Sequence, residues 1–425
     1  MNNEQISKSK NYGWRVTLAA VGINLALGIL YTWSVISKSI PQQWQWSEAD
    51  KSWPYALACL VFALVMVPAG KLQDFYGPRV VASIGGVLVG AGLILASFTT
   101  SPLGFLIGFG LFTGAGIGFA YASATPPAVK WFPAHKTGLI AGIVVSGFGL
   151  ASVYAAPLAK SLTDSFGIQR MALILGIAFL IVIVGLAQFL KAPPEGFVVA
   201  PSRQLHPDQG QGKDYSPREM LKTSSFYKLW FMYACGAGAG LMVIAKLAMI
   251  AREQAALELG FILVAVLALG NGCGRIVAGY LSDHLGRQYT LFSCFILQGV
   301  MIVLLSQATT GSVLAEVPVL CVISALIGAN YGANLAVFPS ITKDFYGLKH
   351  FGMNYGLVFT AWGVGGFMLA LVAGRLYDVY HTFALAYYGA SLLLLMAAVM
   401  TLFVKRPGTV SKPAPFPLFH RLRQL

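Results

Sequence analysis

Long apolar segments alternate with short polar stretches along almost all of this 425-residue chain. Each apolar segment holds about 20 residues, the length an α-helix needs to cross the hydrocarbon core of a bilayer. The segments are 13–36, 52–70, 80–99, 103–128, 138–159, 171–190, 226–250, 260–281, 289–308, 316–339, 351–373 and 383–404. The pattern therefore predicts an all-α membrane protein with twelve transmembrane helices.

One polar stretch is much longer than the others and divides the segments into two sets of six. It runs from Lys191 to Thr223 and contains five prolines among mixed charges. Proline-rich polar sequence of this kind is typical of a linker. We therefore predict an N-terminal half at 1–190, a linker at 191–225 and a C-terminal half at 226–425, which includes a tail.

The two halves repeat two motifs at matching places. Gly-Lys-Leu-Gln-Asp-Phe-Tyr-Gly-Pro-Arg at 70–79 is echoed by Gly-Tyr-Leu-Ser-Asp-His-Leu-Gly-Arg at 279–287. Lys-Trp-Phe-Pro-Ala-His-Lys-Thr-Gly from Lys130 is echoed from Lys343 by a similar run that reaches Gly352. Repeated halves are a mark of secondary transporters, in which the substrate site lies near the membrane midplane between the repeats.

The first of these motifs places an acid and a base in a tight turn. An aspartate is stabilising at a helix N-terminus, and a nearby arginine can pair with it. Such a turn can hold one face of a transporter closed, so we predict a gating role for Asp74 with Arg79 and for Asp283 with Arg287.

Composition supports a membrane protein and explains the basic net charge. The chain is 57% hydrophobic and only 10% charged, against about 25% charged in a soluble protein. The formal net charge of +14 is unevenly spread, because 21 of the 29 Lys and Arg residues fall on the side that carries both termini. By the positive-inside rule both termini are cytoplasmic. We expect a multi-pass protein of the plasma membrane or bacterial inner membrane, and no nucleic-acid partner.

Arg275 is the one formal charge expected deep in the membrane. It lies in the middle of 260–281, whereas all 15 acidic residues fall in or beside predicted loops. A charge at this depth is costly and usually faces a bundle interior or a water-filled cavity. With no carboxylate at similar depth, a ligand that brings its own negative charge is the expected partner, although pairing with helix carbonyls is the alternative. Asn271 shares its helix face and either contacts the ligand or orients Arg275.

Together these motifs resemble a known family over essentially the whole chain. The turns at 70–79 and 279–287, the twelve helices and the central linker resemble the major facilitator superfamily. Asn271-Gly-Cys-Gly-Arg275, Tyr121, Tyr331-x-x-x-Leu-Ala-Val-Phe-Pro-Ser340 and Asn354-Tyr-Gly356 resemble the monocarboxylate transporters and the related oxalate:formate antiporters within it.

The resemblance implies a set of site residues around Arg275 and also shows departures. It implies substrate contacts from Tyr31, Tyr121 and Tyr331. Phe359 and Trp362, three positions apart, are expected to form an apolar or cation–π wall near Arg275, and a second such wall is expected from Val145 and Phe148. Trp362 aligns with a second cation, a Lys, of the oxalate:formate antiporters. Asn271 and Val35 align with an Asp and a Lys of animal-type monocarboxylate transporters. One cation suits a monoanion, and the missing Asp and Lys leave the proton route unassigned.

With the single buried cation, the resemblance implies a carrier of small monocarboxylates such as lactate or pyruvate that works by alternating access, with protons as the coupling ion. A carboxylate exchanger of the oxalate:formate kind is the alternative. Enzyme activity is not expected, because Ser, His and carboxylate do not converge in the sequence. The six histidines fall in loops or tails, so neither a metal site nor a cofactor is predicted. A receptor or scaffold would leave the buried Arg275 and the paired turns without a purpose.

Overall fold

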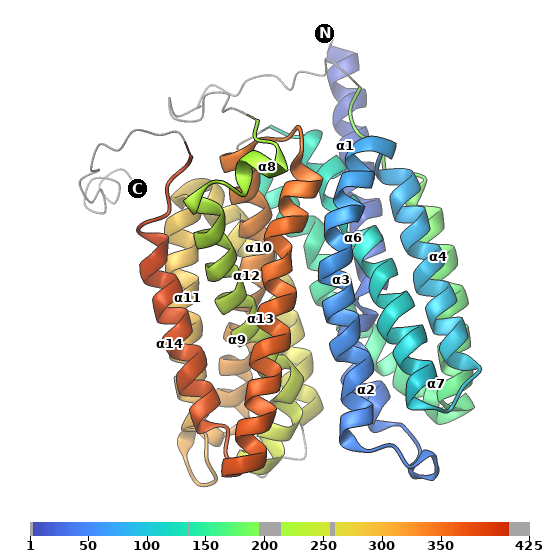
Figure 1. Cartoon of the computed structure of the whole chain (residues 1–425), viewed down its shortest axis with the longest axis vertical. Coiled ribbons are helices and arrows are strands. Elements are labelled where there is room, and N and C mark those ends of the chain that lie inside the picture. The colour runs from blue at the N-terminus through green and yellow to red at the C-terminus, as the bar shows by residue number, and fades with distance from the viewer. Residues whose placement is uncertain (1–2, 134–135, 195–213, 256–259, 408–425) are drawn as a thin grey trace.

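The computed structural model describes residues 3–133, 136–194, 214–255 and 260–407 (Figure 1). All the regular structure in this part of the chain is helical. The helices of the first half are α1 (Asn3–Leu27), η1 (Gly28–Thr32), α2 (Trp33–Lys38), η2 (Gln42–Trp44), α3 (Glu48–Tyr76), α4 (Pro78–Ser97), α5 (Pro102–Phe105), the π-helix η3 (Leu106–Thr113), α6 (Gly114–Lys130) and α7 (Thr137–Ala187). The later ones are α8 (Pro217–Met220), α9 (Ser224–Ala255), α10 (Gly260–Leu285), α11 (Arg287–Ser306), η6 (Val313–Ala315), α12 (Val317–Tyr346), α13 (Phe351–Tyr380) and α14 (Ala384–Thr401).

Eleven helical stretches in the described residues are long and apolar enough to cross a membrane. One of them, Gly138–Ala187, has 50 residues, which as a straight helix would measure about 75 Å against a hydrocarbon core of about 30 Å. Its backbone leaves the helical region at Gly167, with φ 81° and ψ 163°. The stretch therefore makes two crossings, and the described helices supply the twelve predicted spans.

Two turns of the structure are much shorter than the connections that the sequence predicts. The whole of 70–79 was expected to be a connection, but α3 continues to Tyr76 and α4 begins at Pro78. Gly77 alone joins them, with φ 85°, and Gly286 joins α10 to α11 with φ 96°. Backbone with this combination of φ and ψ is almost restricted to glycine, so one residue is enough to reverse the chain.

The helices form two groups that stand side by side, α1 to α7 in one and α9 to α14 in the other (Figure 1). Across the boundary α3 packs against α13, and α7 packs against α10 and α12. Glycines allow these pairs to approach closely: a Cβ added to Gly279 would lie 2.3 Å from the carbonyl oxygen of Gly138, and one added to Gly70 would lie 2.2 Å from that of Gly352. Small residues at such crossings are typical of helix packing in membranes.

The end of the predicted linker docks on the second group of helices. Asp214 accepts hydrogen bonds from the backbone N–H groups of Leu348 and Lys349, and the N–H of Tyr215 donates to the carbonyl of Tyr346 at 2.9 Å. Ser216 and Glu219 form a capping box that starts α8. Residues 195–213 of the predicted linker, and 408–425 of the predicted tail, lie outside the described residues.

Candidate functional site

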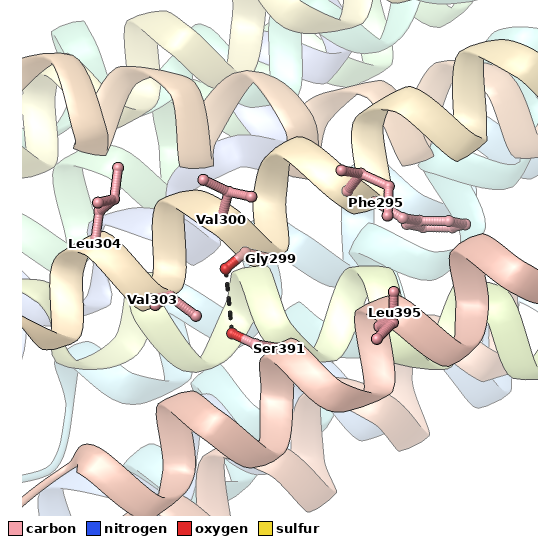
Figure 2. A pocket seen from close by; sticks show the side chains of 8 residues that line it. Phe295, Gly299, Val300, Val303, Leu304, Ser391 and Leu395 are labelled. Atoms are coloured by element: carbon pink, nitrogen blue, oxygen red, sulfur yellow. Dashed lines mark hydrogen bonds between the residues drawn. The ribbon is translucent and has the colours of Figure 1, made fainter.

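The groove drawn in Figure 2 lies between α11 and α14 and is almost entirely apolar. It has a volume of about 380 Å³ and is lined by Phe295, Val300, Val303 and Leu395 among others. Its one drawn hydrogen bond runs from the Ser391 hydroxyl to the Gly299 carbonyl, at 3.2 Å. Several of these side chains are exposed on the outside of the helix group, where lipid contacts the protein. The candidate site for a polar ligand lies elsewhere, between the two groups.

Arg275 of α10 is completely buried between the two groups of helices. Its Nε donates to Oδ1 of Asn271, one turn earlier on the same helix, at 3.0 Å. Its Nη1 donates to the carbonyl oxygen of Val145, on α7 in the other group. Its Cζ lies 5.9 Å from the centre of the Phe148 ring. The guanidinium is thus held by both groups at once, and its Nη2 has no hydrogen-bond partner among the described residues.

A second contact between the groups lies beside it and consists of three aromatic side chains. The hydroxyls of Tyr31, in η1, and Tyr331, in α12, are 2.6 Å apart. Trp362 of α13 donates from Nε1 to the Tyr331 hydroxyl at 2.9 Å. Because an indole N–H is donor-only, Tyr331 accepts from Trp362 and is free to donate to Tyr31. Residues 300 positions apart in sequence thereby form one chain of hydrogen bonds.

Aromatic rings pack against one another next to Arg275. The centre of the Phe148 ring lies 5.0 Å from that of Tyr31 and 5.5 Å from that of Tyr121, and the Tyr121 ring lies 5.5 Å from Phe359. Phe359 and Trp362 stack with their ring centres 5.2 Å apart. The structure therefore brings all nine predicted site residues into one continuous buried cluster, with contributions from both groups of helices: Tyr31, Tyr121, Val145, Phe148, Asn271, Arg275, Tyr331, Phe359 and Trp362.

Three members of this cluster were not predicted. Phe62 of α3 contacts the rings of Tyr121, Phe148, Phe359 and Trp362. The rings of Tyr233 and Tyr355 lie 6.0 and 5.8 Å from that of Phe359. Tyr355 falls within Asn354-Tyr-Gly356, a motif used only for the resemblance, whereas nothing in the sequence distinguishes Phe62 or Tyr233 from the many other aromatic residues of the spans.

Several polar atoms of the cluster have no partner. These buried atoms are Nη2 of Arg275, Nδ2 of Asn271 and the hydroxyls of Tyr121, Tyr233 and Tyr355. An unsatisfied buried polar group costs about 1–3 kcal/mol, so five of them in one cluster need an explanation. All five can donate a hydrogen bond, and one belongs to a fixed positive charge. The arrangement can therefore bind a small anion with several oxygen atoms.

The two predicted gating aspartates each contact a helix of the opposite group. Asp283, near the end of α10, accepts from the backbone N–H groups of Gly138 and Leu139 in the first turn of α7, at 3.0 and 2.9 Å. Asp74, near the end of α3, accepts from those of Gly352 and Met353 in the first turn of α13, at 3.3 Å each. A carboxylate at a helix N-terminus is stabilised by unpaired N–H groups and by the helix dipole. We call the end of the molecule that carries these contacts the latch side.

The two gating arginines, in contrast, differ from each other. Arg287 donates to Asp283 at 2.5 Å and to Asp344 of α12 at 3.0 Å. Arg79 is exposed and has no ion-pair partner among the described residues, so the predicted pairing with Asp74 is wrong. Arg287 directly follows its turn glycine, but Pro78 separates Arg79 from Gly77. One extra residue rotates a side chain by about 100° around a helix, which turns Arg79 away from the latch.

A model of the Major Facilitator Superfamily matches residues 16–251 and again 229–424. The chain belongs to this superfamily. It is thus a multi-pass membrane protein of a transporter family, not an enzyme, with the predicted all-α fold and repeated halves. In the described residues, no group of three or more His, Cys, Asp or Glu side chains is placed to hold a metal ion.

Relatives with curated names agree with the predicted branch of the family. The chain is 28% identical over 371 residues to the oxalate:formate antiporter of Oxalobacter formigenes, covering 85% of each chain. It is 27% identical over 378 residues to monocarboxylate transporter 11 of Homo sapiens, covering 86% of this chain and 77% of that one. A crystal structure of the transporter FucP in the outward conformation superposes with a TM-score of 0.69 at 13% identity, covering 92% of this chain and 98% of that one. That last likeness concerns the fold alone.

Proposed function

We propose that this transporter carries small monocarboxylates of the lactate and pyruvate type by alternating access, and that Arg275 binds the carboxylate. The observation that supports this most is the completely buried guanidinium with a free Nη2, in a cluster that holds further unpartnered donors. A guanidinium presents a planar fork that matches a carboxylate. The free amide N–H of Asn271 suits the hydroxyl or keto oxygen of a 2-substituted acid, and the Phe148 and Phe359 rings suit a short alkyl group.

The presence of one cationic side chain at the described cluster favours a substrate with a single negative charge. Arg275 is the one cation that contacts the cluster within the described residues. The described acidic side chains lie near helix ends or, for Asp164, near the break in α7 at Gly167. The closest acid along α10 is Asp283, eight residues or about 12 Å away, where it is occupied by Arg287 and the α7 N-terminus. A second carboxylate on the substrate would have no cationic partner in the described part of the site, and an unpaired buried charge is costly.

Proton-linked symport is the mode of coupling that we propose, and exchange is the second candidate. Exchange is favoured if the unloaded carrier cannot reorient with an uncompensated charge. Arg275, however, bonds to the Val145 carbonyl across the boundary, and Tyr31 and Tyr331 bond beside it. The Val145 carbonyl can accept from the guanidinium in place of a substrate, which supports net transport. Without an acid in the site, the proton accompanies the carboxylate.

Uptake of labelled lactate into proteoliposomes tests this coupling. We expect an outside-acid gradient to drive accumulation, because the proton enters with the carboxylate, and the opposite gradient to fail. Preloaded unlabelled substrate should accelerate uptake further. A protein-free liposome with the same gradient measures passive entry of the undissociated acid. Uptake that needs internal substrate and ignores external pH would replace symport by exchange, and no carboxylate movement at all would refute the transport proposal.

The charge argument makes a separate prediction about oxalate. Oxalate should be transported at least about 10-fold less efficiently than lactate, since its second carboxylate would be buried without a partner. Trp362→Lys should shift the preference toward oxalate by supplying that partner. Trp362→Phe is the matched control, because it also removes the bond to Tyr331 but adds no charge. Equal transport of oxalate and lactate by the unmodified protein would contradict the argument from one cation.

A further inference from the structure

A second groove opens on the outer surface of the first helix group, between α4 and the last part of α7. These two helices pack against each other (Figure 1). It has a volume of about 460 Å³, and its lining includes Arg79, Ser83, Ile84, Val87 and Gln188. Arg79 and Gln188 lie at the ends of their helices on the latch side. The groove therefore begins at one end of a membrane-spanning helix pair and continues along it.

The chemistry of the groove changes with depth. Arg79 stands at its mouth, and Ser83 follows one turn deeper on α4. The side-chain amide of Gln188 donates to the Ser83 hydroxyl at 3.2 Å and to the Val184 carbonyl. Further along α4 the lining becomes apolar, with the exposed side chains Ile84 and Val87. A cation and polar groups at one end, followed by hydrocarbon, match the headgroup and acyl chain of one phospholipid molecule.

Among the described residues, Arg79 lacks the acidic partners that its counterpart in the internal repeat has. Arg287 is paired with Asp283 and Asp344. In the first half, Trp131 occupies the position that corresponds to Asp344 when the two Lys130 and Lys343 motifs are aligned. Arg79 is also turned outward by the extra residue Pro78, and no acidic side chain lines the groove. A positive charge at the groove mouth is thus left available for an external anion.

We propose that this groove binds an anionic phospholipid from the leaflet on the latch side. Arg79 binds the phosphate through its guanidinium fork, and one acyl chain lies along Ile84 and Val87. The donors of Ser83 and Gln188 are used within the protein, so their side-chain oxygens accept from hydroxyl groups of the headgroup. Arginine is well suited to phosphate, and anionic leaflets attract basic residues at the membrane surface. This site is separate from Arg275 and does not depend on the identity of the transported substrate.

Native mass spectrometry of the full-length protein, with phosphatidylglycerol or phosphatidylcholine of identical acyl chains added to the detergent, tests the proposal. The protein should retain phosphatidylglycerol about fivefold more strongly, the effect of one basic residue near an anionic headgroup. Arg79→Gln should abolish this preference. Ile84→Trp should lower the retention of both lipids by filling the groove. Lys71→Gln is the control, because it removes an exposed charge near the latch-side end of α3. It should leave the preference for phosphatidylglycerol unchanged.

Three outcomes would overturn the proposal. The first is an Arg79→Gln protein that still prefers phosphatidylglycerol. The second is an equal loss in Lys71→Gln, which would assign the preference to general surface charge. The third is displacement of the lipid by millimolar inorganic phosphate with no effect of Ile84→Trp, which would make the groove a site for a free anion.

Discussion

Arg275→Ala is expected to lower substrate affinity by roughly 30- to 3,000-fold and to abolish measurable transport. Removing one partner of a buried, hydrogen-bonded charge pair costs about 2–5 kcal/mol, and each 1.4 kcal/mol is a factor of ten. The substrate carboxylate would then be buried with no cation to balance it. Binding is measured on the purified protein by the effect of lactate on its thermal unfolding temperature, and transport by uptake into proteoliposomes.

Two further substitutions separate loss of binding from loss of folding. Arg170→Ala makes the same change at an exposed position and should affect neither property. Arg275→Lys should remain strongly impaired, because a point charge on a flexible stem does not reproduce the planar fork that reaches Asn271 and Val145. Arg275→Ala should still be expressed, since it removes a buried charge instead of creating one. Near-normal lactate affinity in Arg275→Ala would refute the assigned role.

Gly279→Ala should reduce transport about 5- to 150-fold by opposing closure of the latch side. The new Cβ would lie 2.3 Å from the Gly138 carbonyl oxygen, so α10 and α7 would have to separate. Overpacking of this kind costs about 1–3 kcal/mol. Because the three nearest atoms, from Gly138 and Leu139, all belong to the other helix group, the change mainly destabilises the contact between the groups.

The conformational effect is measured separately from transport. Spin labels at the exposed positions Lys136 and His284, in a variant without the native cysteines, report the distance between the N-terminus of α7 and the C-terminal end of α10. Gly279→Ala should increase the fraction of molecules in which the two labels are far apart. Gly389→Ala is the matched control, since no atom lies within 4 Å of a Cβ built there. An unchanged distance distribution together with unchanged uptake would show that closure at this contact does not limit transport.

Much of the site was predictable because its chemistry is unusual for its surroundings. An arginine in the middle of an apolar run is costly, so it points to a polar interior whatever the packing around it. The two repeated turns locate Asp74 and Asp283 for a similar reason. Glycine allows a tight turn, and an aspartate a few residues away is stabilised at a helix N-terminus, so both features can be recognised from neighbouring residues. The resemblance then located Tyr31, Tyr121 and Tyr331, which composition does not separate from the other tyrosines of the chain.

The hydrophobic pattern by itself determined the number of spans, the division into two halves and the depth of Arg275, because each depends only on neighbouring residues and on the thickness of a bilayer. Tertiary structure alone decided which side chains and backbone atoms contact one another. Arg275 bonds to a backbone carbonyl of Val145, and a carbonyl is common to every residue and leaves no mark in a sequence. Tyr31 reaches Tyr331 across 300 residues, and Tyr233 and Tyr355 join the same cluster through Phe359. Arg79 and Arg287 look equivalent in their motifs, yet one added proline changes the helical phase by about 100°, so Arg287 pairs with Asp283 whereas Arg79 lines the outer groove.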